Sequence, residues 1–514
     1  MMKKTLAGLA AVAAVSLALT SCSAGGSGEG SGGGDEAAAV VPLNIGNFLD
    51  VTSWDPALAD IGFDGPYLSA VYDPLVVDNG KGEPEPALAT KWEVSDDFKT
   101  ITMDLRTDAV FSNGEEFNAD AAVKSLEYLK EGVRSQEAYT KVESFEAVDE
   151  DTIAIHLTQR DDTILYFMGL GRSYMMAPSA IDDGSLATAP VGSGPYTLSD
   201  ASVAGSEYHF DKVADHWAAD DFPFDPLVIS PLSDPTAMLN GMEGGQFNVI
   251  YGDRTAIDLA KDHGWNVSSG VATWVGLQFT DRAGSTEMGK PLGDVRVRQA
   301  LNYAFNGPEM LDALAQGEGA ATNQVFPDGT AGNVPDLNGL YEYDLDKAKE
   351  LLADAGYADG FEVKMPMAPP FQPYQASVEQ VFGELGIKVT WDEYQFMDYM
   401  GNAPTYPMFI GVISMDGNAV ATVERQIVNP QWYNPNTGMD DFPEIKAQAD
   451  KVFAAEPGDA QTAEIEKLNE MVTEEAFYSV WYQANNAYIS TSEFTVTPVI
   501  GMMFPTLRHI NLEG

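Results

Sequence analysis

The stretch that decides the fold is residues 361–394, FEVKMPMAPPFQPYQASVEQVFGELGIKVTWDEY. Its two ends, 361–367 and 387–394, alternate apolar with polar residues, which predicts two β-strands. Between them, apolar residues recur at the spacing of one helix face: Val378, Val381, Phe382 and Leu385. A strand, a helix and a second strand within about 30 residues form a βαβ unit, whose strands are parallel. We therefore expect an α/β protein with a parallel sheet in this part of the chain.

The segments around this unit repeat the mixture of strand and helix patterns. Residues 344–356, DLDKAKELLADAG, predict a helix that Asp344 caps and Gly356 ends. The opening VPLNIGNF, residues 41–48, predicts a first strand, and extended runs occur at 271–279 and 484–490. The chain has 514 residues, more than one hydrophobic core usually supports, so we expect at least two lobes.

The charge of the chain excludes one class of partner. The sequence has 78 acidic and 28 basic side chains, a formal net charge of −50. A surface this negative repels nucleic acid and anionic lipid headgroups. We expect no nucleic-acid partner.

The only cysteine, Cys22, lies between an apolar leader and a glycine-rich segment. Residues 1–21 have the basic start and short apolar run of a signal peptide, and LTSC at 19–22 resembles a bacterial lipobox. Residues 22–40 are too poor in apolar side chains to fold and predict a flexible tether. We expect a lipid on Cys22 that anchors the protein to the outer face of the cell membrane. The alternatives are a plain secretory signal with an accidental cysteine, or a catalytic thiol that nothing in the tail could activate.

Motifs of catalytic and cofactor sites are absent from the sequence. The five histidines form no His-Glu-x-x-His, and a single cysteine cannot make a zinc pair. No nucleophile elbow, phosphate-binding loop or dinucleotide-binding glycine motif occurs. We expect a non-enzyme without metal or cofactor, although 78 acids leave carboxylate chemistry open as an alternative.

Several longer stretches resemble the family 5 extracellular solute-binding proteins, which feed oligopeptide, dipeptide and nickel ABC importers. They lie in the family's order within residues 67–360 and include VYDPLVV, PEPALATKWEVSDDFKTITMDL, GSGPYTL, ADHW, DVRVRQALNYAF and YDLDKAKELLADAGYADG. The resemblance implies a two-lobe class II periplasmic-binding-protein fold. Lobe I would comprise residues 41–272 plus 486–514, with an inserted α+β subdomain at about 86–190. Lobe II would comprise residues 273–485, and the extended runs near 271–279 and 484–490 would be the hinge.

The resemblance also suggests one ligand-binding residue. Peptide-binding relatives use an aspartate after a strand, in an Asp-aromatic sequence, to receive the ligand's ammonium group. Here YPMFIGVISMDGNAVATVE, residues 406–424, places Asp416 after an apolar run, but Gly417 follows it and the family's usual Asp-Pro is missing. Asp416 is therefore either an ammonium acceptor or a turn carboxylate.

Aromatic residues outside clean helical stripes are the other ligand candidates, because a flat ring can stack on a ligand and exclude water. They are Trp54, Trp274, Trp432, Tyr433 and Trp481. For each of them, packing in the core is the alternative role. Trp274 ranks high because it lies at the expected hinge, and Trp432 because it lies in a loop rich in proline and asparagine.

Together these features predict a monomeric, lipid-anchored receptor outside the membrane. It would capture a small organic solute, a peptide or a glycoside, and deliver it to ABC permease subunits. The negative field of the many acidic residues favours an uncharged or cationic solute, and the resemblance to the family favours a peptide. An anchored carboxylate-based hydrolase and a sensory protein that presents its ligand to a receptor are the alternatives.

Overall fold

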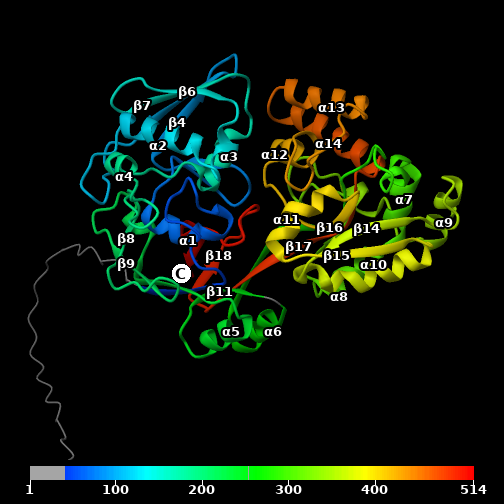
Figure 1. Cartoon of the computed structure of the whole chain (residues 1–514). Helices are drawn as coiled ribbons and strands as arrows, with labels where there is room; N and C mark the ends of the chain where they lie inside the picture. Colours follow the sequence, from blue (N-terminus) through cyan, green and yellow to red (C-terminus); the bar gives the residue numbers. More distant parts are fainter. Residues whose placement is uncertain (1–40, 253, 514) are drawn as a thin grey trace, which may run out of the picture. The chain divides into compact units, whose positions relative to one another are not determined.

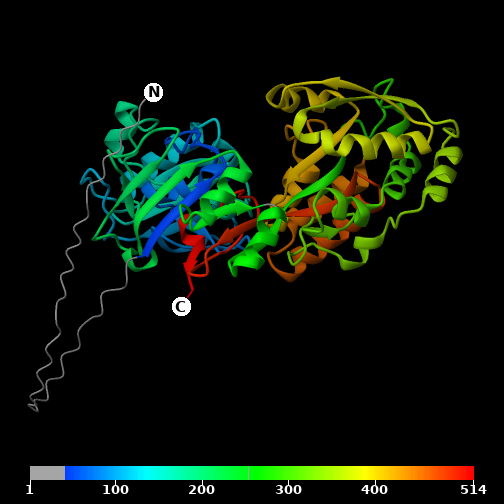
Figure 2. The same ribbon diagram turned by 90° about the horizontal axis from the view of Figure 1, so that it is seen from below.

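The computed structural model of the chain describes residues 41–252 and 254–513 (Figures 1 and 2). The predictions for the signal peptide, Cys22 and the tether lie outside these residues. Among the described helices, none is both long enough and apolar enough to cross a membrane.

The largest sheet has nine strands and confirms the expected first strand at residue 41. Its spatial order is β16 (Met408–Ser414), β12 (Asn266–Phe279), β17 (Tyr478–Ser490), β11 (Val249–Gly252), β1 (Val41–Asn47), β10 (Phe224–Pro231), β9 (Tyr208–Lys212) and β8 (Tyr196–Leu198), with β13 (Gly319–Ala321) paired to β17. Strand β1 runs parallel to β10 and β11, and the other pairs are antiparallel. The sheet is therefore mixed, with its parallel part at β1.

The βαβ unit predicted from residues 361–394 is confirmed. Strands β14 (Glu362–Met367) and β15 (Lys388–Glu393) pair in parallel, and α10 (Gln372–Glu384) connects them (Figure 1). The unit forms a separate two-stranded sheet, so the parallel sheet expected in this region is small. The helix predicted upstream is α9 (Leu345–Asp354), where the side chain of Asp344 accepts a hydrogen bond from the Lys347 amide at 2.8 Å. Gly356 ends this helix with a φ of +90°, which glycine adopts without steric cost.

Three further sheets are small. An antiparallel four-stranded sheet has the order β4 (Ala89–Val94), β5 (Thr100–Leu105), β7 (Thr152–Leu157) and β6 (Val142–Ala147); the two-stranded sheets are β2 (Val76–Asp78) with β3 (Pro84–Pro86) and β18 (Phe494–Val496) with β19 (Ile510–Leu512). Helix α2 (Ala119–Glu131) packs against the four-stranded sheet, as Figure 1 shows. This α+β group lies inside the expected inserted subdomain, whose boundaries stay a prediction.

The remaining α-helices have these bounds: α1 (Ile61–Val71), α3 (Ile164–Phe167), α4 (Pro178–Asp183), α5 (Pro235–Glu243), α6 (Arg254–His263), α7 (Val295–Ala304), α8 (Gly307–Leu314), α11 (Phe396–Asn402), α12 (Ala419–Thr422), α13 (Pro443–Ala454) and α14 (Asp459–Glu474).

Two large hydrophobic clusters make up most of the core. The first draws on residues 43–249 and 488–510 together with Ala421, and the second on residues 274–482. Strands β12 and β17 pair along their length and pass from one cluster toward the other. The register shifts between Val271 and Thr273 and again between Val275 and Gly276. The extended runs expected at 271–279 and 484–490 therefore exist. The lobe boundaries at 272/273 and 485/486 remain a prediction.

Candidate functional site

Asp416 lies in the short loop between β16 and α12, as the apolar run before it predicts. Its side chain is fully buried, and Oδ1 accepts a hydrogen bond from Nη1 of Arg425 at 2.7 Å. Arg425 belongs to η8 (Val423–Val428), the turn that continues α12. The side chain of Asn418 caps α12 by accepting a hydrogen bond from the Ala421 amide, which fixes the end of the loop at the start of the helix.

A second ion pair comes from the first half of the chain. Arg172, at the end of η2 (Met168–Arg172), donates to the carboxylate of Glu137 on η1 (Gln136–Tyr139). The guanidinium carbons of Arg172 and Arg425 lie 5.6 and 5.9 Å from the centroid of the Phe167 ring. One aromatic ring thus lies beside both arginines, and the two ion pairs form one charge cluster, defined here as Glu137, Arg172, Asp416 and Arg425.

A backbone contact joins the same two segments. The amide of Gly417 donates to the hydroxyl of Tyr166 at 3.0 Å. This bond ties the loop that carries Asp416 to α3, the helix that precedes η2.

The charge cluster contains unused hydrogen-bonding capacity. Among the described residues, the buried side-chain atoms without a hydrogen-bond partner include Arg172 Nε, Asp416 Oδ2 and Arg425 Nε. Buried polar atoms are nearly always paired in folded proteins, so three unpaired atoms in one cluster call for an explanation. These three atoms are shielded from solvent in this structure, so pairing them would require the side chains of the cluster to rearrange.

The four charged side chains differ in their access to solvent. The side chain of Glu137 is 40% exposed and that of Arg425 is 24% exposed, whereas that of Asp416 is fully buried. Burial raises the pKa of Asp416, and the charge of Arg425 opposes this effect. The Asp416 carboxylate, in turn, raises the pKa of Arg425. Although burial works to raise the pKa of Glu137, the positive charges of Arg172 and Arg425 lower it below its usual range. The accessible groups are therefore one carboxylate and one guanidinium.

Two of the predicted aromatic residues lie next to this cluster but face the core. Trp274 on β12 is fully buried, and its indole nitrogen donates to Oε1 of Gln426 at 3.2 Å. Tyr433 is buried, and its hydroxyl donates to the backbone oxygen of Arg425 at 3.0 Å. Both side chains therefore pack against η8 on its buried side.

The other three predicted aromatic residues lie elsewhere. Trp432 is 42% exposed and stacks near Phe409, with the ring centroids 6.4 Å apart. Trp54 is buried in the first core beside Tyr67. Trp481 is buried on β17 in the second core. The structure brings Asp416, Trp274 and Tyr433 together around η8 and leaves Trp54 and Trp481 away from it.

Sequence reasoning missed Glu137, Arg172 and Arg425. Arg425 could have been suspected, because it follows Asp416 by nine positions in a chain with few basic residues. Glu137 and Arg172 lie in short turns without a periodic pattern, and only the fold brings them to Asp416.

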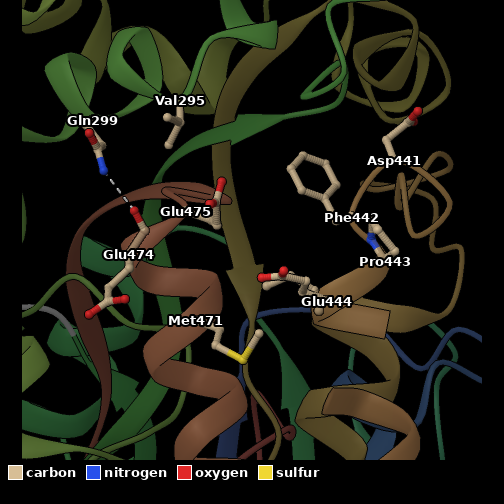
Figure 3. A pocket seen from close by; sticks show the side chains of 10 residues that line it. Val295, Gln299, Asp441, Phe442, Pro443, Glu444, Met471, Glu474 and Glu475 are labelled. Atoms are coloured by element: carbon tan, nitrogen blue, oxygen red, sulfur yellow. Dashed lines mark hydrogen bonds between the residues drawn. The ribbon is translucent and has the colours of Figure 1, made fainter. Parts of the chain in front are cut away.

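Two cavities occur elsewhere among the described residues, and no member of the charge cluster lines either of them. One of about 320 Å³ is lined by Glu424, the neighbour of Arg425, together with Lys141 and Arg160. Another of about 570 Å³ lies between the starts of α7 and α13 and the end of α14 (Figure 3). Around it, Figure 3 shows the carboxylates of Asp441, Glu444, Glu474 and Glu475 beside Phe442 and Met471. This second cavity contains none of the predicted ligand residues. Within the described ranges, no group of three or more His, Cys, Asp or Glu side chains is placed to hold a metal ion.

Comparison with known proteins identifies relatives for most of the chain. The family model described as "Bacterial extracellular solute-binding proteins, family 5 Middle" matches residues 83–433. Heme-binding protein A of Haemophilus influenzae is 29% identical over 388 residues, which cover 68% of this chain and 69% of that protein. The dipeptide-binding protein of Escherichia coli is 27% identical over 401 residues, which cover 71% and 70%.

Solved structures show the same fold. The structure of HbpA2 from Haemophilus parasuis has a TM-score of 0.78 at 21% identity and covers 92% of this chain and 100% of its own. The periplasmic binding protein DppA from Helicobacter pylori, solved with the peptide STSA, has a TM-score of 0.71 at 20% identity and covers 92% and 98%. The expectation of a periplasmic-binding-protein fold is confirmed by these likenesses.

Proposed function

Because the chain belongs to the family 5 extracellular solute-binding proteins of ABC importers, we propose that it is a lipid-anchored receptor that captures short peptides and delivers them to an importer. Members of this family bind solutes and are not enzymes, and we extend that to this chain. The relatives' names differ in ligand, heme in one and dipeptide in another. The solute must therefore be argued from this chain's own residues.

The observation that carries the peptide proposal is the pairing of opposite charges in the charge cluster. A short peptide has an ammonium group at one end and a carboxylate at the other. The accessible carboxylate of Glu137 suits the ammonium, and the accessible guanidinium of Arg425 suits the carboxylate. The buried Asp416 would then fix Arg425 in place, so the ammonium-binding role expected for Asp416 passes to Glu137 in this proposal.

The test is a thermal-shift screen of the full chain with dipeptides whose side chains are uncharged. Binding to the folded state alone stabilises it, so a suitable dipeptide should raise the melting temperature and be recovered intact. The N-acetyl and C-terminal amide forms of the tightest dipeptide each remove one charge. Each should bind at least about tenfold more weakly, which is roughly 1.4 kcal/mol. Equal affinity for all three forms, or no shift with any dipeptide, would refute the peptide proposal, and steady hydrolysis would favour an enzyme.

The lipid anchor has a separate test. Cys22→Ala should release the protein from the membrane fraction or leave its precursor uncut, and Ser23→Ala is the matched control that should change neither. A Cys22→Ala protein that is cut normally and stays in the membrane fraction would contradict the anchor.

A further inference from the structure

Lys141 forms ion pairs with carboxylates from two parts of the chain that lie far apart in the sequence. Its ammonium nitrogen lies 3.3 Å from Oδ1 of Asp161 and 2.5 Å from Oε1 of Glu424. Lys141 directly precedes β6 and Asp161 follows β7, and both strands pack in the first hydrophobic cluster. Glu424 belongs to η8, which packs in the second cluster, and it is the neighbour of Arg425. The side chain of Lys141 therefore links the two cores.

The two carboxylates hold Lys141 in different ways. Asp161 comes from the same part of the chain, and its Oδ1 also accepts hydrogen bonds from the amide and the hydroxyl of Thr163, at 2.9 and 2.7 Å. Asp161 therefore stays beside Lys141 whatever the position of η8. The side chains of Lys141 and Glu424 are only 15% and 11% exposed, so water screens their ion pair less than a pair on the open surface.

Further polar contacts lie beside this pair. Arg160 Nη1 donates to the backbone oxygen of Ala455 at the end of α13, and Gln461 Nε2 on α14 donates to Oδ2 of Asp162, both at 2.7 Å. The cavity of about 320 Å³ lies among these residues, and both parts of the chain line it. Hydrogen bonds and ion pairs are contacts that water can replace, so the two parts can separate here without breaking either core.

The amide of Gly417 lies at the same junction and reports on its separation. Gly417 is buried, and its N–H donates to the hydroxyl of Tyr166, which belongs to the first hydrophobic cluster. The amides of Ala421 and Thr422 lie close by in sequence, but they donate to Asn418 within their own segment. Separation of the two parts would expose the Gly417 amide and leave the other two amides bonded.

We propose that Lys141, Asp161 and Glu424 form a latch that holds the two cores in the arrangement in which the charge cluster is assembled. Glu137 and Arg172 of the cluster come from the first part of the chain, and Asp416 and Arg425 from the second. Opening the latch breaks the contact of Lys141 with Glu424, while Lys141 keeps Asp161. The latch is independent of the peptide proposal, because it acts between residues of the chain itself.

The test is native-state hydrogen exchange of the full chain, followed by NMR without added ligand. Lys141→Met removes the ammonium and keeps most of the length of the side chain. It should speed exchange of the Gly417 amide at least about fivefold, because a charged hydrogen bond between the two parts is lost. Glu424→Gln should act in the same direction. The double variant should exchange no faster than the faster single variant, since both changes remove one contact.

Two controls separate the latch from a general loss of stability. Lys91→Met removes a lysine whose ion pair with Asp104 lies within the four-stranded sheet, and it should leave the Gly417 amide unchanged. In the latch variants, exchange of the Ala421 and Thr422 amides should also stay as in the wild type, because these bonds lie within one segment.

Three results would overturn the latch. One is unchanged exchange of the Gly417 amide in both single variants. Another is exchange of the Ala421 and Thr422 amides that speeds up as much as that of Gly417, which would show local unfolding of α12. The third is a double variant whose effect is the product of the two single effects. Should Lys141→Met fail to fold, Glu424→Gln decides with the same amides.

Discussion

The ion pair Asp416–Arg425 determines which group the charge cluster offers to a ligand, because the buried carboxylate of Asp416 holds the guanidinium of Arg425 from the protein side. Removing one partner of a buried pair leaves a charge without compensation, which costs about 3 kcal/mol or more. Arg425→Met should therefore lower the free energy of unfolding in urea by about 3 kcal/mol. The double variant Asp416→Asn, Arg425→Met should regain at least half of that loss.

The matched control for this cycle is an exposed ion pair, Asp440 with Lys446. Asp440→Asn should change stability by less than about 1 kcal/mol, since exposed pairs contribute little. A double variant as unstable as the sum of the two single variants would show that Asp416 and Arg425 do not act as a pair.

The carboxyl group of Asp64 should make the stability of the folded chain depend on pH. Burial raises its pKa from 3.8 to about 6, although hydrogen bonds from the Thr52 and Asp60 amides oppose the shift. Between pH 3.8 and 6 the folded chain holds a proton there that the unfolded chain has released. The contribution of Asp64 to stability therefore falls as pH rises through this window and is constant above it.

The comparison of Asp64→Asn with the wild type isolates this effect. Relative to the wild type, the variant should gain up to about 1.4 kcal/mol per pH unit between pH 4.5 and 6, and nothing more from pH 7 to 8. A difference that does not vary with pH, or that shrinks as pH rises, would contradict the assignment to Asp64.

Of the residues in and around the charge cluster, sequence reasoning names Asp416, Trp274 and Tyr433. A strand pattern and a family resemblance both point to the loop of Asp416, and its role as a ligand contact stays a prediction. Sequence reasoning predicts Trp274 and Tyr433 as ligand contacts. In the structure both side chains are buried against η8, and neither ring is exposed to solvent. Burial depends on distant strands, so composition around a tryptophan cannot distinguish a core position from a cleft position.

At the scale of elements, β12 and β17 depend on close backbone contact at Gly276. A Cβ atom at this position would lie 2.0 Å from the backbone oxygen of Ser479, and backbone cannot move aside cheaply. Gly276→Ala should therefore lower the free energy of unfolding by more than about 2 kcal/mol. Measured by urea unfolding, a loss below about 0.5 kcal/mol would contradict the tight pairing.

Gly383 provides the control for that substitution. It is an exposed glycine in α10, and an added Cβ would meet no atom within 4 Å. Gly383→Ala should be neutral or stabilise the chain by about 0.5–1 kcal/mol, because alanine favours the helix.

The elements with strong local patterns were predicted well, and their order in the sheet was not. The helices α9 and α10 have apolar spacing and, for α9, a capping residue and a stop residue, all of which are local properties. The pairing of β1 with β10 and β11 joins residues more than 170 positions apart and has no local signature. The local patterns indicate an α/β protein, and the resemblance to a family supplied the periplasmic-binding-protein fold, which those patterns alone could not.

For the whole molecule, the pairing of β12 with β17 supports the proposal that two lobes meet at a hinge. Register shifts beside Val271 and beside Val275 interrupt the long ladder at and just after the expected boundary, and such irregularities let strands bend. If the lobes close on a peptide, a saturating dipeptide should reduce the radius of gyration in solution scattering. The N-acetylated C-terminal amide of the same dipeptide, which lacks both terminal charges, is the control and should leave it unchanged at the same concentration. A dipeptide that binds without reducing the radius would contradict closure.

Titration calorimetry can compare a dipeptide with its C-terminal amide, in the wild type and in Arg425→Met. In the proposed complex, Arg425 of the charge cluster binds the ligand's carboxylate. The wild type should therefore prefer the free acid at least about tenfold, roughly 1.4 kcal/mol. In Arg425→Met that ratio should fall to about one. A wild type that binds both forms equally, or a variant that keeps the full preference, would contradict the claim.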